Sequence, residues 1–160
     1  MLRRLAFAFA MSYETVVQVY ALTGYRMKVA VLVNMLKKEE DPDFFECSDT
    51  VLELFLDGLI TYRRGAKDGA APGMPTTPVK KERLTNNMIL RKIKIALSLK
   101  DFDVVSILLA ANFKVTKSEV NALFQRKEHR NFQECGNQLL RNFLVGLTEK
   151  LRKVSERKKK

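Results

Sequence analysis

Two segments of the chain, 88 residues apart, carry the same stripe of apolar side chains. The stripe follows the i, i+3, i+4, i+7 spacing that places side chains on one face of an α-helix. Its members are Leu52, Phe55, Leu56 and Leu59 in the first segment, and Leu140, Phe143, Leu144 and Leu147 in the second. Each segment is therefore predicted to form a helix with one buried face.

The match extends to a gap-free internal repeat, because residues 1–64 align with residues 89–152 at a constant offset of 88. Further identical pairs are Leu2–Leu90, Arg3–Arg91, Ala8–Ala96, Val16–Val104, Val17–Val105, Glu40–Glu128, Phe44–Phe132, Glu46–Glu134 and Cys47–Cys135. Such a long match without gaps indicates a duplicated structural unit. The predicted fold class is all-α, with two pseudo-repeated four-helix units that are partly helix-turn-helix-like.

The apolar periodicity and the residues that flank it predict the helix boundaries. The expected helices cover residues 2–11, 14–23, 28–38 and 49–62 in the first unit, and 87–98, 102–111, 117–126 and 137–151 in the second. Suitable N-caps are Ser12, Ser48 and Asp101, together with a capping box of Thr116 and Glu119. The first ten residues resemble a secretory signal in part, but the repeat assigns them to a structural helix.

Glycines at equivalent positions suggest how the helices pack. Gly58 and Gly146 lie inside the last helix of each unit, where glycine costs about 1 kcal/mol relative to alanine. We expect another backbone to pass close to each of them. Gly24 aligns with Asn112, and both residue types tolerate the left-handed conformation that ends many helices.

Composition divides the chain into two units, a linker and a tail. Residues 65–83 contain three of the four prolines and are predicted to be a flexible linker between units at 1–64 and 84–152. Residues 153–160 are predicted to be a basic tail. We expect the units to pack on each other through apolar faces, with independent units as the alternative. The helix at 28–38, which is apolar nearly all round, is expected to be buried against the second unit or another chain.

The net charge of +11 is distributed unevenly between the repeats. Residues 1–64 carry a net charge of −1, whereas residues 88–152 carry +6 and the tail +4. Clustered Lys and Arg side chains release counterions from a polyanion, so the second unit is predicted to contact phosphates of DNA or RNA. The alternative is a solvated face that serves solubility. The candidate binding residues are Arg91, Lys92, Lys94, Lys114, Lys117, Asn121, Arg126, Lys127 and Arg130.

A helix-turn-helix would place the third helix of the second unit in the major groove, with Lys117, Asn121 and Gln125 exposed. The spacing argues against this interpretation, because the inward-facing Val120 lies eight positions after Asn112 rather than six. A helical bundle without groove contacts is the alternative. Base-edge contacts are therefore expected to be few and sequence preference weak.

No pattern of catalytic or metal-binding residues stands out. Cys47 and Cys135 are predicted to be small buried hydrophobic residues, and His129 a surface or loop histidine. An enzyme, a cofactor and a metal site are not expected. The acidic run of Glu39, Glu40, Asp41 and Asp43 suggests a second function class, a protein–protein adaptor. Such an adaptor would use this loop and the apolar helix of the first unit to bind a partner or to self-associate.

Four long strings resemble the YehS-like family of uncharacterised bacterial proteins, which carry a domain of unknown function as two repeats. They are LKKEEDPDFFECSD and LDGLITYRRG in the first unit, and LTNNMILRKIKIALSLKD and NFQECGNQLLRNFLVGL in the second. The resemblance implies a small cytoplasmic protein with a duplicated helical domain. It implies no catalytic residue, cofactor or substrate. No segment has the roughly 20 apolar residues that span a bilayer, so a membrane partner is not expected.

Overall fold

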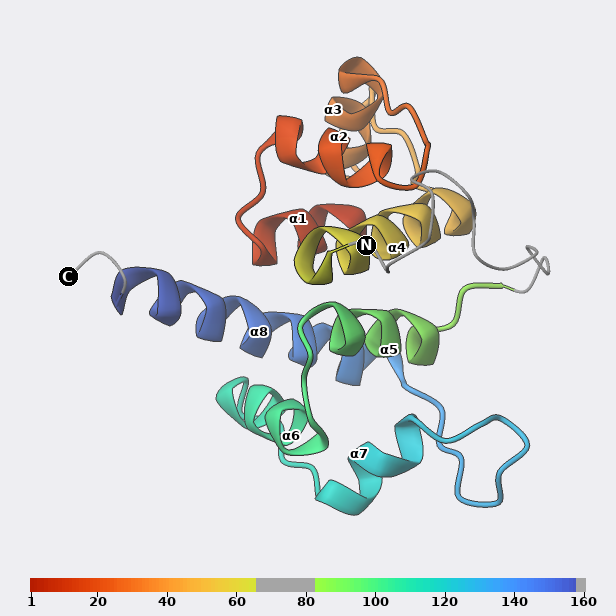
Figure 1. Cartoon of the computed structure of the whole chain (residues 1–160), viewed down its shortest axis with the longest axis vertical. Helices are drawn as coiled ribbons and strands as arrows, with labels where there is room; N and C mark the ends of the chain where they lie inside the picture. The colour runs from red at the N-terminus through yellow and green to blue at the C-terminus, as the bar shows by residue number, and fades with distance from the viewer. Residues whose placement is uncertain (66–82, 158–160) are drawn as a thin grey trace. The chain divides into compact units, whose positions relative to one another are not determined.

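The computed structural model describes residues 1–65 and 83–157. The greater part of the predicted linker and the last three residues therefore lie outside the described residues. The chain forms two compact units, divided between Leu84 and Thr85. Each unit contains four α-helices, and the described residues include no strand (Figure 1).

The first unit contains α1 (Leu2–Ala8), α2 (Tyr13–Ala21), α3 (Val29–Leu36) and α4 (Asp49–Arg64). Helix α2 packs on both α3 and α4, and α1 packs on α3. The core is built from side chains that these helices direct inward. Its fully buried members include Leu5, Val16, Val19, Tyr20, Leu32, Phe55, Leu56 and Leu59.

The second unit repeats this arrangement with α5 (Asn86–Ala96), α6 (Asp101–Ala110), α7 (Lys117–Leu123) and α8 (Asn137–Arg157). Helix α6 packs on α7 and α8, and α5 packs on α8. The core positions match those of the first unit at the offset of 88. They include Ile93, Val104, Ile107, Leu108, Val120, Phe143, Leu144 and Leu147, all buried. The predicted duplication of a four-helix unit is confirmed.

The predicted caps are confirmed with one exception. The Ser12 and Ser48 hydroxyls accept hydrogen bonds from the backbone N–H groups of Thr15 and Val51. Thr116 and Glu119 form the predicted capping box, in which the Glu119 carboxylate accepts from the Thr116 N–H at 2.7 Å. The assignment of Asp101 was wrong. Helix α6 has Lys100 as its N-cap, and the Asp103 carboxylate accepts the Lys100 N–H at 2.7 Å.

Some helix ends also differ from the prediction. Helix α1 ends at Ala8 because Ala10 adopts a left-handed conformation with φ of 50°. Helix α8 continues to Arg157, well into the predicted tail, because no glycine or proline follows Gly146.

Gly58 and Gly146 mark close crossings of helix backbones, as predicted. A Cβ atom on Gly58 would lie closer than 3.0 Å to the Val19 carbonyl oxygen of α2. A Cβ atom on Gly146 would meet the carbonyl oxygen of Ile107 in α6 in the same way. Val19 and Ile107 are themselves repeat equivalents, so the two units use one packing device.

The turns that end α2 and α6 have the predicted left-handed residues, Gly24 with φ of 75° and Asn112 with φ of 56°. In α3, Leu32 and Met35 are buried, whereas Val29 is 52% exposed and Val31 is 37% exposed. The expected contact of this apolar helix with the second unit or another chain stays a prediction. Only one face of this short helix meets α1 and α2.

Candidate nucleic-acid interface

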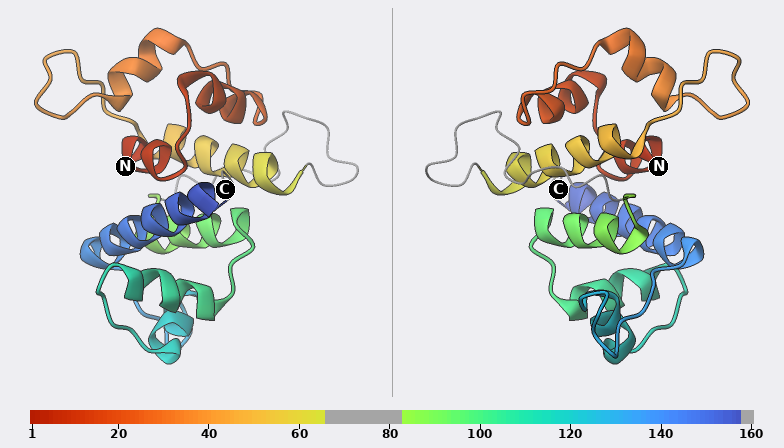
Figure 2. Two further views of the ribbon diagram at one scale, coloured as in Figure 1. Left: turned by 90° about the vertical axis from the view of Figure 1, so that its left-hand side faces the viewer. Right: turned by 90° about the vertical axis from the view of Figure 1, so that its right-hand side faces the viewer.

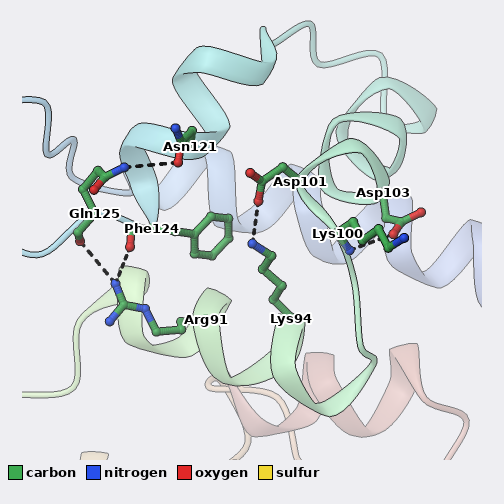
Figure 3. Close-up of polar contacts among 8 residues, drawn as sticks. All are labelled: Arg91, Lys94, Lys100, Asp101, Asp103, Asn121, Phe124 and Gln125. Carbon is green, nitrogen blue, oxygen red and sulfur yellow. Dashed lines mark hydrogen bonds and ion pairs between the residues drawn. The ribbon is translucent and has the colours of Figure 1, made fainter.

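Arg91 is exposed, but its guanidinium is engaged in hydrogen bonds within the second unit. Its guanidinium donates from Nη2 to the carbonyl oxygens of Phe124 at 2.8 Å and Gln125 at 3.2 Å (Figure 3). These carbonyls follow the last turn of α7, where unpaired oxygens and the helix dipole favour a cation. Arg91 therefore fixes the end of α7 onto α5.

Lys94 is also engaged. Its ammonium lies 2.5 Å from the Asp101 carboxylate and 4.0 Å from the centre of the Phe124 ring (Figure 3). Both members of the ion pair are partly buried. Lys92, the third predicted contact residue on α5, is half-buried. The predicted cluster on α5 is thus largely committed to the fold.

Two asparagines at the start of α5 hold the loop of residues 124–136, which leads from α7 to α8. The Asn87 amide donates to the Leu123 and Gln133 carbonyl oxygens, both at 2.9 Å, and its Oδ1 accepts the Cys135 N–H at 2.9 Å. Asn87 is buried, with 9% of its surface exposed. The Asn86 amide donates to the Cys135 carbonyl at 3.0 Å. Both ends of the loop are therefore tied to α5.

The loop has an ordered backbone of its own. The Gln133 N–H donates to the Ala122 carbonyl at 3.1 Å. His129 is exposed, as predicted, and its Nδ1 accepts the Asn131 N–H at 3.1 Å. A ring that accepts at Nδ1 carries its proton on Nε2 when it is neutral.

The remaining predicted basic residues lie on and around this frame, and all are exposed. We refer to them as the α7 surface, which consists of Lys114, Lys117, Arg126, Lys127 and Arg130. Asn121 is exposed as well, but its Oδ1 accepts from the Gln125 side chain at 3.2 Å. Figure 1 shows the loop after α7 reaching beyond the helices of its own unit, and Figure 2 shows the equivalent loop between α3 and α4 of the first unit doing the same.

The equivalent loop of the first unit has the opposite charge and a similar backbone. The Asp41 carboxylate accepts the Asp43 N–H at 3.0 Å, which is the place of the His129–Asn131 contact in the repeat. This hydrogen bond lowers the pKa of Asp41. Lys37 lies 2.8 Å from Asp43 and 3.3 Å from Asp41, and the Asp43 contact raises its pKa.

The helix-turn-helix likeness is limited to the order of α6 and α7. Residues 111–116 separate them, whereas the DNA-binding motif has a turn of about three to four residues. Helix α7 itself has seven residues, and Glu119 on its first turn is tied to Thr116, which lowers the pKa of the carboxyl. A hollow of about 130 Å³ lies beside α7, lined in part by Lys114, Leu123 and Leu139.

The two cysteines lie in different units. Cys135 is buried as predicted, and burial raises the pKa of its thiol to about 11. Cys47 is only half-buried, so that part of the prediction was wrong, and burial raises its pKa as well. Among the described side chains, no three His, Cys, Asp or Glu residues gather in a way that could hold a metal ion.

The positioning roles of Asn87 and Arg91 were not foreseen from the sequence. One signal was present for Asn87, which lies one helical turn before the buried Leu90 on the inward face of α5. A polar residue on an otherwise apolar stripe suggests that buried backbone groups need a partner. The carbonyls that it meets are brought there by residues more than 30 positions away.

The two-unit architecture has counterparts among known sequences. Residues 1–65 and 86–153 match DUF1456, which is described as a protein of unknown function. The chain belongs to this family. It is 37% identical over 146 residues to "Uncharacterized protein YehS" of Escherichia coli (strain K12), and the match covers 91% of this chain and 90% of that protein.

The comparison thus spans both units and confirms the YehS-like resemblance. No solved structure matches the chain. Within residues 1–65 and 83–157, every helix is too short or too polar to cross a lipid bilayer.

Proposed function

We propose that this protein is a non-enzymatic nucleic-acid-binding protein of the bacterial cytoplasm, which contacts phosphates through the α7 surface. The observation that carries the proposal is the exposure of five basic side chains around a loop that Asn87 and Arg91 hold in place. Fixed Lys and Arg side chains can displace condensed counterions from a polyanion.

Comparison between the units supports a role beyond solubility. At the offset of 88, Lys117, Lys127 and Arg130 correspond to Val29, Glu39 and Pro42. The same fold is therefore built without positive charge at these three positions. The other two residues of the α7 surface, Lys114 and Arg126, correspond to Arg26 and Lys38, which are also basic. A surface that is more basic in one repeat than in the other favours a specific polyanionic partner.

The test uses the full chain and a labelled random-sequence duplex or single strand at about 50 mM salt, where phosphate contacts are strong. Binding is measured by fluorescence anisotropy. Neutralising four residues of the α7 surface to alanine (Lys117, Arg126, Lys127 and Arg130) should abolish most of the binding. A matched control neutralises four basic residues of the first unit, Arg26, Lys28, Lys38 and Arg64, and should retain it. Equal effects of the two sets, or no binding by the wild type, would refute the proposal.

Arg91 and Lys94 are left out of this test because their replacement removes structural contacts. Arg91→Ala would weaken binding by releasing α7, which is a positioning effect. The pair Lys117→Ala and Asn121→Ala addresses groove reading. We expect it to lower affinity equally for all sequences, because few side chains of the seven-residue α7 can reach base edges.

A protein–protein adaptor is the second candidate function. It is favoured by the exposure of Val29 and Val31 on α3, where the second unit has Lys117 and Glu119. The acidic loop of the first unit would add charge complementarity to a basic partner. Partners that remain in a pull-down after nuclease treatment, and that are lost on Val29→Lys with Val31→Glu, would support the adaptor.

A further inference from the structure

The hollow beside α7, of about 130 Å³, shares residues with the α7 surface. Lys114 belongs to that surface and also lines the hollow, and the exposed Lys117 follows three residues later. Gln133, on another side of the hollow, belongs to the loop 124–136 that carries the remaining basic residues of the α7 surface. A molecule that contacts the α7 surface therefore has this hollow within its reach.

The wall of the hollow is mainly apolar. Phe113 contributes an aromatic residue, and Val115, Leu123 and Leu139 contribute aliphatic side chains. Leu123 is buried and the other three are half-buried. The Phe113 N–H donates to the Leu108 carbonyl at 2.9 Å, which fixes the backbone at this part of the wall. Such a wall suits a flat, uncharged ring better than a phosphate.

Two exposed polar side chains, Glu119 and Gln133, complete the wall. The Glu119 Oε2 atom accepts from both the N–H and the hydroxyl of Thr116, each at 2.7 Å, so the carboxylate is held in place. A pyrimidine base has an N–H or amino donor on its pairing edge. A carboxylate accepts from such a donor, and a glutamine amide both donates and accepts. The polar part of the wall therefore matches the edge of a base.

The fold itself does not require these features. At the offset of 88, the two polar residues of the wall correspond to Val31 and Phe45. Val115 corresponds to Met27, which is larger and only 6% exposed. The first unit thus folds with apolar side chains at both polar positions and with a bulkier residue in place of Val115. The wall of the hollow differs from its repeat equivalent in the unit that also has the more basic surface.

The volume of the hollow limits what it can hold. An apolar cavity of about 150 Å³ takes up a single benzene ring. Pockets for larger ligands measure about 300–1,000 Å³. A hollow of about 130 Å³ therefore has room for one six-membered ring and not for two fused rings.

We propose that this hollow receives one unstacked pyrimidine base of a single-stranded nucleic acid, while the neighbouring phosphates contact Lys114 and the rest of the α7 surface. This inference rests on the proposed function. It adds that the ligand is single-stranded, because a base in a duplex is paired and stacked and cannot enter a pocket. An apolar side chain of a protein partner would fit the wall as well, but the basic surroundings favour a polyanion.

The test uses the full chain and three single strands of equal length, which have the same phosphates and differ only in their bases. One strand is abasic throughout, one has a single central thymine, and one has a single central adenine. Affinity is measured by fluorescence anisotropy at about 50 mM salt. We expect the thymine to raise affinity at least about fivefold over the abasic strand, as stacking of one base does. Adenine should raise it less, because its fused rings exceed the hollow.

The decisive variant is Val115→Met, which introduces the residue of the first unit and occupies part of the hollow. We expect the gain from thymine to fall to about twofold or less. Affinity for the abasic strand should not change, because no charge is lost. The matched control is Val105→Met, at a half-buried position of α6 that does not line the hollow, and it should keep the full gain.

A second pair of variants addresses the aromatic residue. Phe113→Leu should reduce the gain from thymine, and Phe113→Tyr should retain it, because the first unit has Tyr25 at this position. Thermal unfolding checks that each variant is folded. If Val115→Met unfolds, the comparison of the two Phe113 variants decides, and an equal gain in both would count against the hollow.

The outcomes separate this inference from the proposed function. Equal binding of the thymine-bearing and abasic strands by the wild type would overturn the inference and leave the phosphate contacts standing. No binding of any strand would overturn both. An equal gain from adenine would refute the assignment to a pyrimidine, and a full gain in folded Val115→Met would refute the assignment to the hollow. Loss of nuclease-resistant protein partners in Val115→Met, without any gain from thymine, would show a protein side chain to be the occupant instead.

Discussion

Single side chains in this protein hold together backbone segments that are distant in sequence. Asn87 is the clearest case, because one buried amide satisfies two carbonyls and one N–H at both ends of the loop 124–136. A buried polar group left without its partner costs about 1–3 kcal/mol. The position of the basic loop therefore depends on the side chain of Asn87.

Asn87→Asp should destabilise the second unit by about 3 kcal/mol or more, because two donors are lost and a carboxylate faces two carbonyl oxygens. Denaturant unfolding of the full chain measures this cost. Hydrogen exchange of the Cys135 amide should quicken, since its acceptor is part of the same network. Asn121→Asp, at an exposed position on α7, is the control and should have little effect. Equal stability of the two variants would contradict the anchoring role.

Left-handed residues give a second prediction at this scale. Ala10 and Ser98 are repeat equivalents with φ of 50° and 52°, and both are exposed. The left-handed conformation costs an L-residue about 1–2 kcal/mol, and glycine avoids this strain at some cost in entropy. Ala10→Gly and Ser98→Gly should each raise stability by about 0.5–1 kcal/mol in thermal unfolding. Ala30→Gly, within helix α3, should lower stability, and the same sign for all three variants would count against the explanation.

Among the helices, the crossings of α4 on α2 and of α8 on α6 set the geometry of each unit. Gly58 and Gly146 let the backbones approach so closely that the carbonyls of Val19 and Ile107 occupy the space of a side chain. A methyl group at either glycine has to push a backbone rather than a flexible side chain. The helices would then have to separate, which would disrupt the packing of the core around them.

Gly58→Ala and Gly146→Ala should therefore each destabilise the chain by about 3 kcal/mol or more, despite the higher helix propensity of alanine. Calorimetry of the full chain is the measurement. Gly136→Ser is a suitable control because nothing lies within 4 Å of a Cβ atom there. Serine already caps the equivalent helix at Ser48. A stabilising effect of either alanine variant would show that the crossing can relax.

At the scale of the whole molecule, the notable feature is the charge difference between two copies of one fold. Residues 1–64 carry a net charge of −1 and residues 88–152 carry +6. The matching cores show that folding imposes no such difference. The charge is a property of the surface, and its consequences are expected in association with other charged molecules.

If the wild type neutralises about six phosphates, the logarithm of its affinity should fall with the logarithm of salt concentration at a slope of about −4 to −5. The variant lacking Lys117, Arg126, Lys127 and Arg130 should have a slope shallower by about 3–4, because each lost contact removes about one counterion. The first-unit control should keep the wild-type slope. An unchanged slope in the α7 variant would mean that phosphates are bound elsewhere.

The sequence by itself determined the all-α class, the duplication, most capping residues and the close approach at Gly58 and Gly146. These follow from local periodicity and from comparison of the two repeats, which amounts to an internal alignment. The end of α1 was not predicted correctly, because alanine rarely adopts the left-handed conformation that Ala10 has. An apolar composition alone does not show which face of α3 is buried within its own unit, where the buried residues are Leu32 and Met35.

Only the tertiary structure decided which basic residues are available for a partner. In the sequence, Arg91 and Lys94 are clustered basic residues, as Lys127 and Arg130 are. In the fold, however, Arg91 binds a carbonyl at the end of α7 and Lys94 binds the Asp101 carboxylate. The carbonyl acceptors of Arg91 are more than 30 residues away, and Asp101, the partner of Lys94, lies seven residues along the chain on the next helix. Charge can be read along a chain, but the partner of a charge depends on how the chain folds back on itself.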